Sequence, residues 1–228
     1  MKAVVIRKFN DELSEGLADQ CIESAKQFNI TVTKVDGVYD CHYELLQEYN
    51  LFPYPKIVTK KLRLGYIGCF LSHFLLWKEC VATQQPILIF EHDGLMIRPL
   101  PNNILDTFDT ILNLDPASRT ADDYEEYLQL DQELTIDPYP YVVTDKLKYR
   151  SINMTHIKGI HAYIIKPAGA EFLLNSINKF GYIAADVAIN QFYVGFYATK
   201  PSYARINPFF CNKKNVKQFS HTNGENAC

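Results

Sequence analysis

Two carboxylates, Glu91 and Asp93, stand one residue apart directly after the apolar run 86–90. That run has the length and composition of a buried strand, and charged side chains at its end must pair, meet water or hold a metal. In an α/β sheet, the carboxyl ends of the strands face the crevice where ligands bind. Carboxylate oxygens there suit a hard dication, Mg²⁺ or Mn²⁺, that also holds substrate phosphates. The alternative is a strand that merely ends in a solvated turn.

The segment before this strand is expected to form a buried helix, because residues 68–77 are apolar nearly all round. Ser72 and His73 lie side by side in its middle, and both need hydrogen-bond partners if they are buried. Taken alone, His73 is typical of a core histidine bonded to a backbone carbonyl. As a pair, the two residues could instead position the loop of Glu91 and Asp93, or contact a bound nucleotide.

The run GYIGCFLSHFLLWKECV, followed by ILIFEHDG, resembles glycosyltransferase family 25, which includes lipooligosaccharide sugar transferases and collagen galactosyltransferases. The chain departs from the family at Tyr66, where Glu is usual, and at His92, where Asp is usual. Both outer carboxylates are retained, so the resemblance still implies a metal site. The residues that match the family pattern are Gly65, Ile67, Gly68, Cys69, Ser72, His73, Trp77, Glu91 and Asp93.

Weaker resemblance extends toward both ends of the chain. The apolar run 2–7 reads as a first strand, and Arg7 approximates a nucleotide-contacting position of the family. Residues 35–37 match a short family signature, and the β-branched run 30–33 just before them predicts the second strand. Residues 159–174 look like the family's later strand and helix, and Asp186 resembles the Asp of its catalytic region.

The resemblance implies an α/β, GT-A-like nucleotide-sugar transferase fold, with a mostly parallel central sheet and helices on both faces. The alternation of strand and helix patterns along the chain independently favours this class. We expect one glycosyltransferase domain over residues 1–228, which is long enough for a single sizeable core. Within it, residues 1–97 would form the donor nucleotide-binding half. Residues 98–228 would form the acceptor half, with a C-terminal lid.

The family resemblance further implies a metal-dependent, inverting transfer from a nucleotide-diphosphate sugar, a UDP-sugar, to a hydroxyl group. Glu91 and Asp93 would bind Mn²⁺ or Mg²⁺, and Asp186 would be the catalytic base. Asp186 could equally cap a helix that starts near residue 187. A non-catalytic nucleotide- or sugar-binding protein with this fold is the alternative function. The candidate donor-binding residues are Arg7, Arg63, Gly65, Ser72, His73 and Lys214.

The C-terminal segment 208–228 is rich in Asn, Lys, Ser and His. It is either a disordered tail or a segment that folds over the donor site. In the second case His221 is the candidate for an additional metal ligand, and the lysines at 213–217 could meet a diphosphate. The acidic stretch 115–137 is expected to be a solvated excursion.

The composition bears on partners and location. A net charge of −3 gives no bulk attraction to nucleic acid or to an anionic membrane. The acceptor is expected to be a saccharide or a hydroxymethylated base in DNA, the latter favoured by basic residues at 60–63 and 213–217. No apolar run approaches the ~20 residues of a membrane span. We therefore expect a cytoplasmic protein, with its six cysteines reduced.

Overall fold

The computed structural model describes residues 1–39, 42–54, 64–116, 135–138, 148–149, 152–153, 160–189 and 194–211. Its centre is a seven-stranded sheet in the order β2-β1-β3-β9-β5-β10-β6. Strands β9 and β6 run antiparallel to their neighbours, and the other five share one direction. The strands of this sheet are β1 (Lys2–Arg7), β2 (Thr33–Asp36), β3 (Ile87–Glu91), β5 (Ile111–Asn113), β6 (Thr135–Pro138), β9 (Ala162–Ile165) and β10 (Phe196–Lys200).

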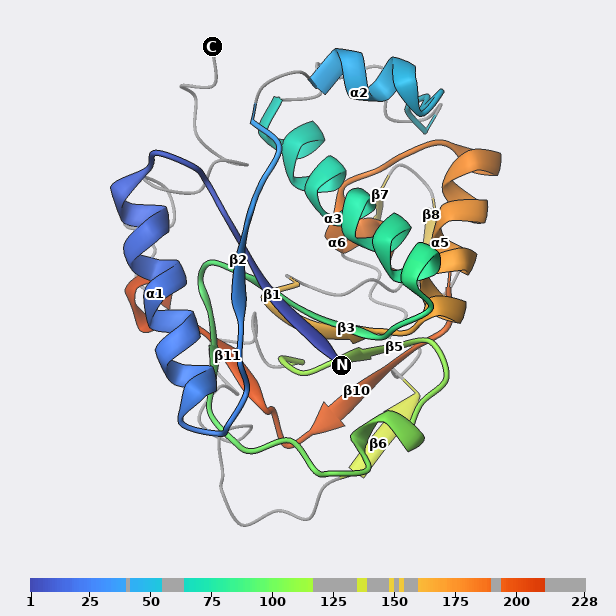
Figure 1. Cartoon of the computed structure of the whole chain (residues 1–228). Helices are drawn as coiled ribbons and strands as arrows, with labels where there is room; N and C mark the ends of the chain where they lie inside the picture. Colours follow the sequence, from blue (N-terminus) through green and yellow to red (C-terminus); the bar gives the residue numbers. More distant parts are fainter. Residues whose placement is uncertain are drawn as a thin grey trace.

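Helices cover both faces of the sheet (Figure 1). Because side chains alternate along a strand, β1 supplies Val5 to the face under α1 (Glu12–Lys26) and Val4 to the opposite face. That opposite face is covered by α3 (Leu64–Thr83) and α5 (Pro167–Phe180), with the shorter α2 (His42–Glu48) and α6 (Ala185–Ala188) beside α3. The expected GT-A-like α/β class, with a mostly parallel sheet between helices, is confirmed.

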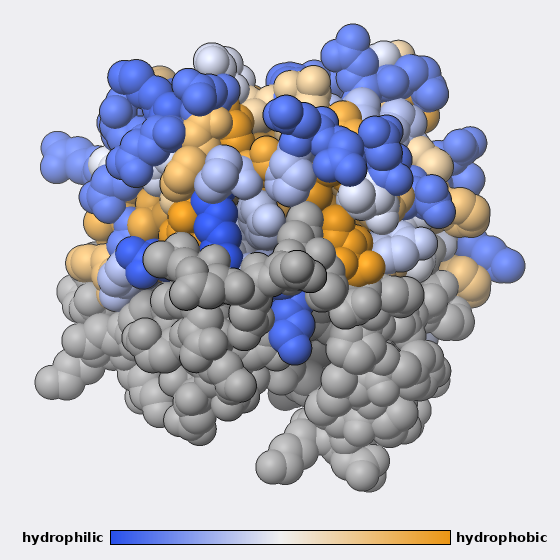
Figure 2. All heavy atoms as spheres, turned by 90° about the horizontal axis from the view of Figure 1, so that it is seen from below, coloured by the Kyte–Doolittle hydropathy of each residue, from blue (hydrophilic) through white to orange (hydrophobic). Residues whose placement is uncertain are grey.

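The remaining elements are short. Strands β4 (Gly94–Met96) and β11 (Ala204–Ile206) pair antiparallel, as do β7 (Lys148–Tyr149) and β8 (Ile152–Asn153). Two 3₁₀ turns, η1 (Ile104–Asp106) and η2 (Pro208–Cys211), complete the described structure. On the face shown in Figure 2, hydrophilic residues surround smaller exposed hydrophobic areas.

The helix α3 is the buried helix that the sequence predicts. Phe70, Leu71 and Trp77 are fully buried, and the helix packs on the sheet beside α5. No helix among the described residues is long and apolar enough to cross a membrane. Cys69 and Cys80 on this helix are free thiols, as is Cys21 on α1.

Two expectations from the sequence need correction. The second strand begins at Thr33 instead of Ile30, because the backbone N–H of Ile30 donates to the carbonyl of Ala25 and closes the end of α1. The acidic stretch is also not solvated at its start, since Asp115 is only 1% exposed. Residues 117–134, which hold most of that stretch, lie outside the described part of the chain.

Candidate active site

Glu91 and Asp93 come together with a histidine from a distant part of the chain. Because β9 runs antiparallel to β3, residue 161 meets the carboxyl end of β3, and the Glu91 N–H donates to the His161 carbonyl over 3.1 Å. His161 Nδ1 lies 2.9 Å from Asp93 Oδ1 and 3.6 Å from Glu91 Oε2. A Cβ on Gly94 would lie 2.2 Å from the His161 carbonyl oxygen, so glycine permits this close approach.

The charges of Glu91, Asp93 and His161 shift one another's pKa values. Burial alone would raise the pKa of Asp93, but the His161 charge and hydrogen bond lower it to about 2. The pKa of Glu91 is also lowered, because the hydrogen bond from His73 and the charge of His161 outweigh burial. Burial lowers the pKa of His161, and the neighbouring carboxylates raise it to about 9. Without a metal, both carboxylates are therefore ionised and His161 is protonated at neutral pH.

His73 is held by a chain of hydrogen bonds that ends on Glu91. The Trp77 indole can only donate, so its Nε1–H donates to the Tyr163 hydroxyl over 2.9 Å. The Tyr163 hydroxyl can then donate its own hydrogen to His73 Nδ1, which is 2.8 Å away. This leaves the proton of a neutral His73 on Nε2, which faces Glu91 Oε1 at 3.5 Å. The expected backbone-carbonyl partner of His73 is therefore corrected to the Tyr163 hydroxyl.

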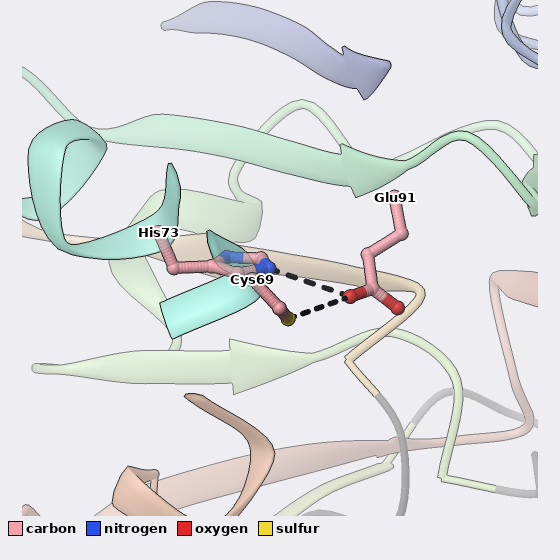
Figure 3. Close-up of side chains that lie close together, drawn as sticks. All are labelled: Cys69, His73 and Glu91. Carbon is pink, nitrogen blue, oxygen red and sulfur yellow. Dashed lines mark hydrogen bonds and ion pairs between the residues drawn. The ribbon is translucent and has the colours of Figure 1, made fainter. Parts of the chain in front are cut away.

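Figure 3 shows Cys69 and His73 on α3 pointing together toward the Glu91 carboxylate. Cys69 Sγ lies 3.7 Å from Glu91 Oε1. Burial, followed by the negative charge of Glu91, raises the pKa of the Cys69 thiol well above its usual value. Cys69 is thus a protonated thiol, which can donate to Glu91 but is a poor metal ligand.

Ser72 ties α3 to the loop after β2. Its hydroxyl donates to the Gly68 carbonyl over 2.7 Å and accepts the Val38 N–H over 2.8 Å. Gly68 itself lies against the Val38 backbone, where a Cβ would approach the carbonyl oxygen to 2.3 Å. Ser72 therefore contacts the loop after β2 and His73 contacts Glu91, and the predicted role of this pair in nucleotide binding stays a prediction.

The other predicted site residues lie away from the carboxylate cluster or outside the described part of the chain. Arg7, at the end of β1, forms ion pairs with Glu15 and Asp36, so its guanidinium joins three elements. Gly65 lies in the first turn of α3 and is partly buried. Arg63, Lys214 and His221 lie outside the described residues, so their predicted roles stay predictions.

Asp186 lies within the first turn of α6, near the cluster. The helix begins at Ala185 with Ala184 at the N-cap position, so the alternative that Asp186 caps a helix starting near residue 187 is wrong. The Asp186 side chain is partly buried, and its charge contributes to raising the pKa of the Cys69 thiol. Its charge therefore acts on the thiol that contacts Glu91.

His161 and Asp115 are site residues that sequence reasoning missed. Asp115 follows β5 and His161 precedes β9, and both strands are short and buried. A polar residue at the end of a buried strand is the same signal that drew attention to Glu91. Asp115 is almost fully buried, and burial raises the pKa of its carboxyl to about 7 against the opposing charge of His161. The pairing of β9 between β3 and β5, which brings these residues to one place, has no local sequence pattern.

Two groups of side chains in the described structure have the chemistry to hold a metal ion. The ligand atoms of Glu91, Asp93 and His161 all lie within 4.8 Å of one another, as do those of Cys69, His73 and Glu91. The first group offers two ionised carboxylates, which are suitable ligands for Mn²⁺ or Mg²⁺. In the second group the protonated thiol and the hydrogen-bonded His73 make coordination less favourable.

Comparison with known proteins agrees with the sequence motif. The family model described as Glycosyltransferase family 25 (LPS biosynthesis protein) matches residues 15–189. The crystal structure of mouse xyloside xylosyltransferase 1, apo form, shows weak similarity with a TM-score of 0.34 and 10% sequence identity. That similarity covers 82% of this chain and 79% of the mouse chain. A search of curated proteins gave no match. The family match spans well over half of the chain, including α3 and the carboxylate cluster, and the protein therefore belongs to glycosyltransferase family 25.

Proposed function

We propose that this glycosyltransferase is metal-dependent and moves a sugar from a nucleotide-diphosphate sugar, a UDP-sugar, to a hydroxyl acceptor. The observation that carries this proposal is the convergence of Glu91 and Asp93 at the carboxyl end of β3, both with lowered pKa values. Ionised carboxylates at this edge of an α/β sheet are placed to hold a dication against a diphosphate. Family membership supplies the sugar-transfer chemistry.

Glu91 and Asp93 would hold Mn²⁺ or Mg²⁺ in this proposal. Such an ion, when bound, neutralises the diphosphate that departs as the glycosidic bond breaks. His73 and Cys69 contact Glu91 at Oε1, whereas Oε2 faces His161. The hydrogen bonds from α3 thereby fix the rotamer of Glu91 and leave its second oxygen directed toward the Asp93 side of the cluster.

Asp186 is the proposed base of an inverting reaction. Its carboxylate would take the proton of the acceptor hydroxyl as that oxygen forms its bond to the anomeric carbon. On the opposite face of the sugar, the bond from the anomeric carbon to the diphosphate oxygen breaks, and its electron pair leaves with the nucleotide. The partly buried position of Asp186, whose charge acts on the Cys69 thiol, supports this role.

The proposed acceptor is a saccharide or a hydroxymethylated DNA base. The basic residues that favour DNA, at 60–63 and 213–217, lie outside the described structure. The experiment must therefore distinguish the two acceptor classes. A panel of UDP-sugars is incubated with the protein and Mn²⁺, Mg²⁺ or EDTA, and nucleotide release is measured. Active donors are then offered with saccharides or hydroxymethylated DNA, and the masses of the products are determined.

Asp93→Asn tests the metal assignment, because it keeps the size of the side chain and removes its charge. Metal-dependent donor turnover should be lost, while Asp106→Asn, an exposed residue on η1, should behave as wild type. Calorimetry showing UDP binding with unchanged Mn²⁺ dependence in Asp93→Asn would contradict the assignment. Nucleotide binding without any turnover by the wild type would indicate the non-catalytic alternative.

A further inference from the structure

His161 lies beside Glu91 and Asp93, in a position from which its imidazole can bind a metal ion. It is held on the sheet by the Glu91 N–H, and its Nδ1 lies within 3.6 Å of a carboxylate oxygen from both Glu91 and Asp93. Among the described residues, the ion-pair partners of Glu91 and Asp93 are histidines, with no Lys or Arg. An imidazole nitrogen and two carboxylates thus surround one point, and no described lysine or arginine forms an ion pair there.

A second, independent observation comes from the other neighbour of β9. The pairing of β5 with β9 places Asn113 opposite Tyr163, and the Leu114 N–H donates to the Ala162 carbonyl. β5 ends at Asn113 and the chain bends at Leu114, where the Asp115 N–H donates to Asn113 Oδ1 over 3.0 Å. The charges of His161 and Asp93 both act on the Asp115 carboxyl, so this buried carboxyl lies near the cluster.

Asp115 is a buried residue whose carboxylate lacks a hydrogen-bond partner among the described residues. It is 1% exposed, and within the described residues neither carboxylate oxygen has a hydrogen bond. The backbone of Ile206 lowers the pKa of this carboxyl, but burial raises it more. A buried carboxylate in this state is costly, and a bound cation with its water ligands would satisfy it. A buried carboxylate near His161 therefore adds to the negative charge that a cation would neutralise.

We propose that His161 is a direct metal ligand beside Glu91 and Asp93, with the buried Asp115 near the site, and that the nitrogen donor selects Mn²⁺ over Mg²⁺. This inference rests on the proposed metal-dependent function. Imidazole nitrogen suits first-row transition metals, whereas Mg²⁺ prefers oxygen ligands and keeps much of its water. Since all the ligands belong to the sheet and its strand ends, the site is formed before a nucleotide arrives. Mn²⁺ binding then requires neither donor nor the C-terminal His221.

The experiment measures Mn²⁺ binding to the full chain without nucleotide, from the loss of the free-ion electron paramagnetic resonance signal. Mg²⁺ is then titrated as a competitor, which gives the ratio of the two affinities. His161→Gln should weaken Mn²⁺ binding at least about tenfold and Mg²⁺ binding less. His92→Gln is the matched control, because His92 stands between the two carboxylates in sequence but its Nδ1 contacts Ser14 Oγ at 2.9 Å. It should bind Mn²⁺ as the wild type does.

His161→Asp keeps the inference testable if the Gln variant does not fold. With an oxygen in place of nitrogen, this variant should still bind a dication but with a smaller preference for Mn²⁺. An unchanged ratio of Mn²⁺ to Mg²⁺ affinity in His161→Asp, or wild-type Mn²⁺ affinity in His161→Gln, would overturn the inference.

The outcome is separable from that of the proposed function. Donor turnover with an unaltered metal site in the His161 variants refutes only the ligand inference. Mn²⁺ binding through His161 without turnover of any donor supports the ligand inference and refutes the transferase proposal.

Discussion

Tyr163→Phe tests the hydrogen-bond chain that holds Glu91, because it removes a single oxygen from the middle of that chain. Tyr163 is fully buried, and its hydroxyl joins the Trp77 indole to His73 Nδ1. The variant leaves two buried polar groups without their partner, at roughly 1–3 kcal/mol each. The sum is roughly 2–6 kcal/mol, a large part of the ~5–15 kcal/mol stability of a typical domain.

The loss is measured by urea unfolding and by the melting temperature. For a chain of this size, 1 kcal/mol corresponds to about 2–4 °C, so the expected fall in melting temperature is at least about 4 °C. Tyr182→Phe is the matched control. Tyr182 is also buried and stacks on Phe70 of α3, and its hydroxyl has no hydrogen bond to a described residue. It should change stability by less than about 1 kcal/mol.

The hydrogen-bond chain through Tyr163 and His73 also predicts how mutations combine. His73→Ala and Tyr163→Phe remove the same hydrogen bond, so the double variant should be less destabilised than the sum of the two. Nitrogen NMR should show the His73 proton on Nε2 in the wild type and a mixture of tautomers in Tyr163→Phe. If Tyr163→Phe melts within 1 °C of the wild type and His73 keeps its tautomer, the inferred chain does not hold this histidine.

Three further predictions follow from the site. The metal-free protein should lose stability as pH rises from 6.5 to 9, because the pKa of His161 in the folded protein lies above its unfolded value of 6.5. The expected loss in the free energy of unfolding is up to about 3 kcal/mol. Urea unfolding in EDTA measures it, and the loss should be smaller in His161→Gln. Gly94→Ala should cost about 3 kcal/mol or more, since the new Cβ would meet the backbone oxygen of His161; equal unfolding midpoints would contradict the strand contact. Removing residues after Phe210 should preserve the core and abolish sugar transfer if the C-terminal segment is a lid; a full transfer rate would make it an ordinary tail.

The sequence alone determined the parts of the site that depend on local patterns. The apolar helix around Ser72 and His73 and the buried strand ending at Glu91 are both present where their periodicity predicts them. The motif shared by these two elements also indicated family 25, which the family match confirms. Local propensity and hydrophobic period suffice here, because a buried helix or strand shows its environment in its own composition.

Only the tertiary structure decided which side chains meet. His161 belongs to the site because β9 inserts antiparallel between β3 and β5, and Asp115 follows β5, the strand on the other side of β9. The partner of His73 is Tyr163, ninety positions away in sequence. Contacts of this kind depend on strand order and register, which are fixed by the packing of the whole core and have no signature within any single segment.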